Sequence, residues 1–317
     1  MMQSMKAIQK IGTSIALREI PRPARTSADE VLIRVAAAGV CRTDVYVAIG
    51  RIPAADPLVL GHEFSGIIEE AGSASAFSRG ERVAVMPLIP CGNCSECNRD
   101  LATLCQNRTM LGVDRDGAFA EFVTVPTKAV WRIPQKLSFT EAAYAEPVAA
   151  ALGVLNAELP AGAKGLIYGK NRFSALVRQV LTASGFTDID IHDAGVRGGR
   201  LADNSYDFAI ETIADSNALS AIVRAVRPRG TVVLKSRPPI PIGLDMHTAV
   251  MKELTLRGAC YGSFKQGIGM MVEGAIDVRG LLGEVHPLED FQAIFARALE
   301  DESTKLFFSP GGGLCAE

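Results

Sequence analysis

Four cysteines within fifteen residues constrain this chain more than any other feature of its sequence. They are Cys91, Cys94, Cys97 and Cys105. Two residues lie between the first and second cysteine and between the second and third, and seven lie between the third and fourth. Thiolates are soft ligands, and a short loop that carries four of them can wrap one tetrahedral Zn2+ ion. Because four protein ligands leave no position open for a substrate, we expect a structural zinc site. An iron–sulfur cluster and four unlinked surface thiols are the alternatives.

The composition is that of an ordinary globular protein. The 317 residues are 48% hydrophobic and 21% charged with a formal net charge of −2, and this length favours two domains of ~150 residues. Such a charge balance predicts no nucleic-acid or anionic-membrane partner, and no apolar run reaches the ~20 residues that span a bilayer. The first residues lack the apolar stretch of a signal peptide. The odd count of seven cysteines argues against a disulfide framework, so we expect a cytoplasmic protein.

Hydrophobic periodicity divides the chain into a mainly β part and an α/β part. Before residue 138, short apolar or alternating runs predict strands over 31–35, 65–69, 82–85 and 119–125. Ser138 and Glu141 then form the pattern of a capping box at a helix start. From there on, helices and buried strands alternate, with strands over 165–168, 189–191, 207–211 and 231–234 and a last strand over 305–308. This alternation predicts βαβ units and a parallel sheet.

Four motifs resemble those of the zinc-containing medium-chain dehydrogenases, which include alcohol, sorbitol and threonine dehydrogenases. One is the cysteine pattern, and the others are residues 39–44 (GVCRTD), 61–66 (GHEFSG) and 116–121 (DGAFAE). The resemblance runs over nearly the whole chain and implies an α/β protein. A mainly-β GroES-like catalytic domain would span 1–148, a shortened Rossmann-like parallel-sheet domain 149–262, and a return to the catalytic domain 263–317. It also implies a homodimer or homotetramer, paired through an edge strand around 255–259.

The same resemblance implies a second, catalytic Zn2+ at Cys41 and His62, and therefore two zinc ions per chain. Tyr144-Ala145-Glu146-Pro147 stands where alcohol dehydrogenases have a later cysteine ligand, which resembles the polyol-dehydrogenase branch. In that branch Glu63 is a ligand, and Glu146 contacts the metal or its water. The alternative for Glu146 is a helix cap. A zinc ion with an open position polarises an alcohol and lowers its pKa.

Proton transfer would be the task of residues that follow Cys41. The resemblance implies that Thr43 accepts the proton of the alcohol. It also implies that Asp44 orients His62 without binding the metal itself. Without the resemblance, this Thr-Asp pair would be read as an ordinary turn. Tyr46 stands where many relatives carry the histidine that ends the proton relay. We therefore expect a relay that is altered or runs through water.

The nucleotide-binding turn departs from its usual pattern. A dinucleotide site has G-x-G-x-x-G after the first strand, so that the backbone approaches the pyrophosphate at a helix N-terminus. Here Gly169 is retained, whereas Asn171 and Ser174 replace the other two glycines. Lys170 and Arg172 add positive charge, and their side chains either bind the phosphate or obstruct its site.

Downstream of that turn, one feature of the sequence favours a nucleotide site and another departs from the usual pattern. Asp193 lies 24 residues past Gly169, at the end of the second strand, where an acid holds the ribose 2′-OH of NAD; a strand-end turn is the alternative. Only 13 residues separate Asp193 from Asp207, where the fourth strand should start. A strand and two helices do not fit in that gap, so we expect the third strand to be missing. Arg42 is a further candidate contact for the pyrophosphate.

These observations predict a zinc-dependent oxidoreductase. It would transfer hydride between a small secondary alcohol, polyol or amino alcohol and a nicotinamide cofactor, with NAD preferred over NADP. One alternative is a non-redox zinc enzyme (a lyase, isomerase or hydrolase) on the same scaffold that has lost nucleotide binding. Another is a catalytically silent interaction protein, against which the intact metal motif argues.

Overall fold

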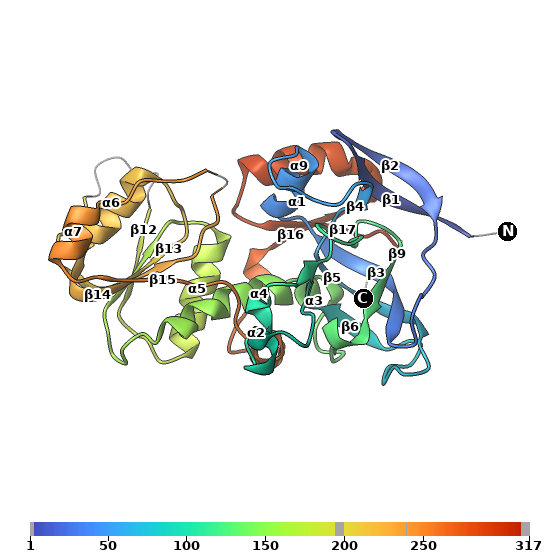
Figure 1. Cartoon of the computed structure of the whole chain (residues 1–317), viewed down its shortest axis with the longest axis horizontal. Coiled ribbons are helices and arrows are strands. Elements are labelled where there is room, and N and C mark those ends of the chain that lie inside the picture. Colours follow the sequence, from blue (N-terminus) through green and yellow to red (C-terminus); the bar gives the residue numbers. More distant parts are fainter. Residues whose placement is uncertain (1–2, 194–199, 239, 312–317) are drawn as a thin grey trace. The chain divides into compact units, whose positions relative to one another are not determined.

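The computed structural model describes residues 3–193, 200–238 and 240–311, which form two compact units (Figure 1). Unit 1 comprises residues 1–146 and 278–317, and unit 2 comprises residues 147–277. The chain returns to unit 1 later than the expected position, residue 263. The reason is that helix α8 (Phe264–Glu273) packs on α4 (Ala145–Leu152): a Cβ atom on Gly267 would lie 3.1 Å from Val148 Cγ1.

Unit 1 is built mainly of strands. In chain order its strands and helices are β1 (Ser4–Ile11), β2 (Ser14–Pro21), β3 (Glu30–Gly39), α1 (Arg42–Ala48), β4 (Leu58–Val59), β5 (Glu63–Ala71), β6 (Arg82–Val85), β7 (Leu88–Ile89), α2 (Ser95–Asn98), β8 (Thr109–Met110), β9 (Phe122–Pro126), β10 (Val130–Arg132), α3 (Phe139–Ala143), β16 (Leu282–His286), α9 (Phe291–Glu300) and β17 (Lys305–Phe308). Short 3-10 helices lie at Ala102–Leu104, Thr127–Ala129, Arg279–Leu281 and Leu288–Asp290.

The main sheet of unit 1 pairs the late strand β17 with the early strand β3. Its strand order is β10-β6-β5-β3-β17-β16, with β9 also paired to β3. β17 runs antiparallel to β3, and Phe307 lies opposite Gly39. The core beside this sheet contains Phe119, Phe295 and Phe308, whose rings lie 5.0–6.3 Å apart. Strand pairing therefore carries the C-terminal segment to the end of β3, two residues before Cys41.

The predicted strands of this unit fall within β3, β5 and β6, but the fourth begins later than expected. β9 starts at Phe122, whereas Phe119 and Ala120 belong to a buried loop. The backbone N–H of Phe119 donates to the carbonyl of Leu60 instead of continuing the strand. The buried apolar residues of this loop therefore extended the apparent strand in the sequence beyond its true start at Phe122.

Unit 2 is an open parallel sheet. Its strands and helices are the rest of α4, β11 (Gly165–Tyr168), α5 (Arg172–Ala183), β12 (Ile189–His192), β13 (Tyr206–Glu211), α6 (Ser216–Ala225), β14 (Val226–Leu234), α7 (Met246–Met251), β15 (Thr255–Gly258) and α8, with a 3-10 helix at Gly153–Ala157. The strand order is β12-β11-β13-β14-β15, and all four pairings are parallel. In the described part of the chain β12 is an edge strand, which is the arrangement that a missing third strand gives. We call the line of residues that directly follow these strands the carboxyl edge.

The helices are too short or too polar to cross a bilayer: within residues 3–193, 200–238 and 240–311 there is no candidate membrane-spanning helix.

Candidate metal and nucleotide sites

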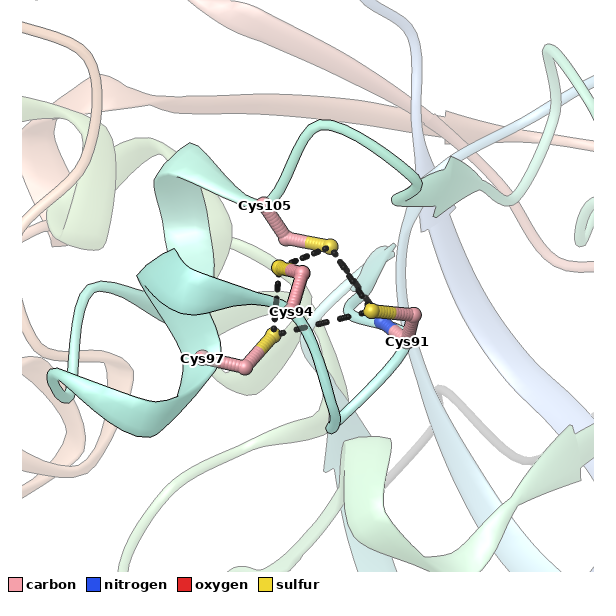
Figure 2. A group of neighbouring side chains, drawn as sticks. All are labelled: Cys91, Cys94, Cys97 and Cys105. Carbon is pink, nitrogen blue, oxygen red and sulfur yellow. Dashed lines mark hydrogen bonds between the residues drawn. The ribbon is translucent and has the colours of Figure 1, made fainter.

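The four clustered cysteines direct their sulfur atoms toward one point (Figure 2). Neighbouring Sγ atoms lie 3.5 Å (Cys94–Cys97 and Cys91–Cys105), 3.7 Å (Cys94–Cys105) and 4.0 Å (Cys91–Cys97) apart. A tetrahedral Zn2+ with Zn–S bonds of about 2.3 Å requires S–S edges of about 3.8 Å. The observed separations therefore fit a structural zinc ion.

Local backbone geometry prepares these thiols for a metal. Cys94 is the N-cap of α2, and Gly92, with φ of 88°, turns the chain so that its N–H donates to Cys97 Sγ at 3.3 Å. A backbone hydrogen bond at Asn93 lowers the pKa of Cys91 to about 6. A backbone hydrogen bond at Cys97 lowers the pKa of Cys94, but burial and the neighbouring thiols outweigh it and raise that pKa to about 12. The lowered pKa of Cys91 favours its thiolate, and a metal in the cluster would displace the proton of Cys94.

All six cysteines that the structure describes are free of disulfides, and Cys315 lies outside the described residues.

A second group joins Cys41, His62 and Glu63, whose ligand atoms all lie within 4.8 Å of one another. Cys41 is the N-cap of α1, and Glu63 is the first residue of β5. The side chains of His62 and Glu63 are each 2% exposed, whereas Cys41 is half-buried. One thiolate, one imidazole and one carboxylate form a donor set that suits Zn2+ and is smaller than a closed four-ligand set.

Asp44 holds the first two members of this group in place. Its Oδ2 accepts from the backbone N–H of Cys41 at 2.9 Å, and its Oδ1 lies 2.8 Å from His62 Nδ1. Burial lowers the pKa of His62, but the charge and hydrogen bond of Asp44 outweigh it and raise that pKa well above its usual range. Since Asp44 engages Nδ1, the other ring nitrogen, Nε2, is the atom that remains for a metal.

Lys305 is a member of this site that the sequence analysis missed. Its Nζ lies 2.5 Å from Glu63 Oε2, and the two side chains are 3% and 2% exposed. The ammonium also lies 5.9 Å from the ring centroid of Tyr144. The signal in the sequence is a lysine at the start of Leu-Phe-Phe, a run that by itself predicts only the last strand. A charge within a buried strand requires a partner, and here the partner is a proposed metal ligand.

The remaining predicted residues of unit 1 are less closely grouped. Thr43 Oγ1 lies 3.7 Å from Cys41 Sγ, beside the metal group. Tyr46 lies on α1 under the guanidinium of Arg51, at 5.6 Å, and Arg42 forms an ion pair with Glu302 at 2.9 Å. Glu146 is 5% exposed and belongs to the first turn of α4, but it is not part of the group formed by Cys41, His62 and Glu63.

In unit 2, the turn that replaces the glycine motif is closed by its own side chains. Gly169 has φ of 124°, and a Cβ atom there would lie 2.3 Å from Thr212 Oγ1, so only glycine fits. Asn171 is the N-cap of α5, and its Oδ1 accepts from the N–H of Ser174 at 2.9 Å. Ser174 Oγ in turn lies 2.8 Å from Thr212 Oγ1. A helix N–H that could bind a phosphate is therefore already paired.

Charged residues flank this turn. Lys170 Nζ lies 3.4 Å from Asp193 Oδ2, with exposed fractions of 69% and 35%, so the acid proposed to bind a ribose faces a cation of the turn itself. Arg172 is the first residue of α5 and is half-buried. Both basic residues, Lys170 and Arg172, flank the turn, and one of them, Lys170, forms an ion pair with Asp193.

Comparisons with known proteins agree with this geometry. Residues 27–135 match the alcohol dehydrogenase GroES-like domain. The chain is 33% identical over 245 residues to the starvation-sensing protein RspB of Escherichia coli K12, covering 76% of this chain and 68% of that protein. It is 28% identical to L-threonine 3-dehydrogenase of Bacillus subtilis over 345 aligned positions, covering 96% and 99%.

The fold also has close counterparts among solved structures. A protein from Sinorhizobium meliloti, described as a zinc-binding dehydrogenase and bound to NADP, superposes with a TM-score of 0.88 at 26% identity, covering 97% of this chain and 100% of that one. This agreement extends over both units.

Proposed function

Because the chain belongs to the zinc-containing medium-chain dehydrogenases, NAD(P)-linked oxidoreductases that act on alcohols, we propose that it oxidises a small secondary alcohol, polyol or amino alcohol at the group formed by Cys41, His62 and Glu63. The observation that carries this proposal is that group itself, with His62 oriented by buried Asp44. The similarity to an L-threonine 3-dehydrogenase supports a substrate with a second polar group next to its hydroxyl. The non-redox alternative loses support because the chain is similar over nearly its whole length to an L-threonine 3-dehydrogenase and to a zinc-binding dehydrogenase.

Two zinc ions per chain are part of the proposal, one among the four clustered cysteines and one at the catalytic group. A zinc ion with an open position acts as a Lewis acid and lowers the pKa of an alcohol. The chain itself holds the ligands still, through the hydrogen bonds of Asp44 and the ion pair between Lys305 and Glu63. Glu146 is proposed to contact the metal or its water.

The side chain proposed to accept the proton of the alcohol is Thr43. Its hydroxyl lies beside Cys41 on the first turn of α1, and it can pass a proton on because a hydroxyl both donates and accepts. Tyr46 lies one helical turn further on and carries no imidazole. The onward path therefore runs through water or the Tyr46 hydroxyl.

The nicotinamide cofactor supplies the hydride acceptor, and we propose that NAD is preferred. Asp193 can accept from a ribose 2′-OH and repels a 2′-phosphate. Lys170, 3.4 Å from Asp193, reduces that repulsion. Lys170, Arg172, Gly169, Asn171 and Arg42 are the candidates to face the pyrophosphate.

We propose that two copies of the chain pair through β15. All four residues of this edge strand are exposed, and Leu256 is 39% exposed. Helix α7 adds Met246, Val250 and Met251, which are 60–71% exposed. An exposed edge strand beside apolar side chains favours association. Light scattering should give a dimer or tetramer; a monomer at micromolar concentration would refute this pairing.

The activity is tested by mixing zinc-loaded protein with secondary alcohols, polyols and amino alcohols in the presence of NAD or NADP. We expect at least one class to generate reduced cofactor, seen as absorbance at 340 nm. The Cys41→Ser variant, with its four clustered cysteines intact, should not. Absence of reduced cofactor with every class, in protein whose zinc content is full, would contradict the proposed function.

A further inference from the structure

The carboxyl edge of unit 2 is the part of an open parallel sheet where nucleotides bind. Lys235 is the first residue after β14 at this edge. Its ammonium donates to the backbone carbonyl oxygens of Ala259, at 3.1 Å, and of Cys260. These two carbonyls follow β15, so the lysine side chain bridges two adjacent strand ends.

Two aromatic rings flank the same ammonium. The centroid of Phe173 lies 5.6 Å from Lys235 Nζ, and that of Tyr261 lies 5.9 Å away. Phe173 comes from the first turn of α5, directly after the altered glycine turn. Contacts of a cation with ring faces are attractive. The ammonium of Lys235, which follows β14, therefore lies among groups from two other parts of the carboxyl edge, the start of α5 and the segment after β15.

Glu211 fixes the backbone from which this side chain starts. It ends β13 and is 1% exposed. Its Oε2 accepts from the backbone N–H groups of Lys235 at 3.2 Å and Ser236 at 3.0 Å, and its Oε1 accepts from Ser236 Oγ at 2.5 Å. A buried carboxylate with three donors is held firmly. The position of Lys235 is thus set by the sheet rather than by a free loop.

The chain occupies its own carboxyl edge at a second point. Asn171 Oδ1 accepts a hydrogen bond from the backbone N–H of Ser174 in α5, and Ser174 Oγ contacts Thr212 Oγ1. Backbone N–H groups at a helix start, backbone carbonyls and aromatic faces are the features that hold a nucleotide in a parallel sheet. In this structure one such N–H and two such carbonyls are bound by polar side chains of the protein.

We propose that Lys235 competes with the cofactor for the carboxyl edge and thereby sets its affinity. A nucleotide binds there only in molecules whose ammonium has left the carbonyls of Ala259 and Cys260. This inference rests on the proposed function, in that the ligand is a nicotinamide nucleotide. When only a fraction of the protein is competent, the apparent affinity falls by that fraction.

The test is a fluorescence titration of NADH into wild-type protein, Lys235→Met and the control Lys252→Met. The ammonium of Lys252 also donates to backbone carbonyls, those of Val223, Arg224 and Val226, but at the end of α6 and the beginning of β14. The Kd of Lys235→Met should be about tenfold lower than that of the wild type, as for a protein that is ~10% competent. The Kd of Lys252→Met should stay at the wild-type value.

The possible failures are distinguishable. Unchanged or weaker binding by Lys235→Met would overturn the role of Lys235 and leave cofactor use intact. If neither protein binds NADH or NADPH at millimolar concentration, the cofactor of the proposed function fails as well, because removing the lysine has not opened the site.

A second measurement needs no variant and applies even if Lys235→Met does not fold. Amine labelling of wild-type protein, followed by mass spectrometry, should show Lys235 reacting faster when NADH is present, because the displaced ammonium reaches solvent. Lower or unchanged labelling of Lys235 with bound NADH would mean that the lysine stays in place, and would overturn the proposal.

Discussion

Replacing Lys305 by methionine should destabilise unit 1 strongly. Lys305 and Glu63 lie 2.5 Å apart with exposed fractions of 3% and 2%, and methionine would leave the Glu63 carboxylate buried beside an apolar side chain. Removing one partner of a buried pair costs about 3–5 kcal/mol. For a unit of this size, each kcal/mol shifts Tm by about 2–4 °C, so we expect a decrease of roughly 6–20 °C.

The chain offers a matched control for this variant. Lys6 and Glu289 form a pair of nearly the same length, 2.7 Å, but with exposed fractions of 52% and 49%, and exposed pairs contribute little. Thermal unfolding followed by circular dichroism at fixed zinc concentration should place Lys6→Met near the wild type. Equal Tm values for Lys305→Met and Lys6→Met would refute the reasoning.

Four further predictions follow from the sites. Thr43→Ala should slow turnover by roughly 10²–10⁴ with zinc content unchanged; near-normal turnover would assign the proton to water or another hydroxyl. Cys94→Ser should prevent stable folding of purified protein, because structural zinc stabilises small sites by ~10 kcal/mol or more; an unchanged Tm would argue against that site. Asp193→Ala should reduce the preference for NADH over NADPH in titrations, and an unchanged ratio would remove Asp193 from the ribose site. Burial and the hydrogen bond to Asp190 raise the pKa of Tyr206 to about 12, above the unfolded value of about 10, so stability should fall between about pH 10 and 12 in urea titrations, and less so in Tyr206→Phe.

Local sequence signals predicted local structure well. Ser138 caps α3 through the N–H of Glu141, as the capping-box pattern indicated. The spacing of the four cysteines predicted their convergence because one short loop carries all of them. The pairing of Cys41 with His62 was accessible only through family motifs, since β3 and β5 must first pair to bring the two together.

Contacts between distant segments were beyond the sequence. Lys305 reaches Glu63 because β17 pairs with β3, which itself pairs with β5. The local sequence Lys-Leu-Phe-Phe does not indicate that Glu63 is the partner of the lysine. The bridge from Lys235 to Ala259 likewise depends on the parallel pairing of β14 with β15. The replacement of two glycines in the nucleotide turn was visible in the sequence. That Asn171 caps α5 by accepting from the N–H of Ser174 was seen only in the structure.

Metal analysis of purified wild-type protein and the Cys41→Ser variant tests the central claim most directly. The two ligand sets predict about two zinc ions per chain in the wild type and about one in Cys41→Ser, because the variant loses a ligand of the catalytic group and keeps all four clustered cysteines. Retention of the wild-type zinc content by Cys41→Ser, or a single zinc ion in both proteins, would contradict a catalytic zinc centre at Cys41, His62 and Glu63.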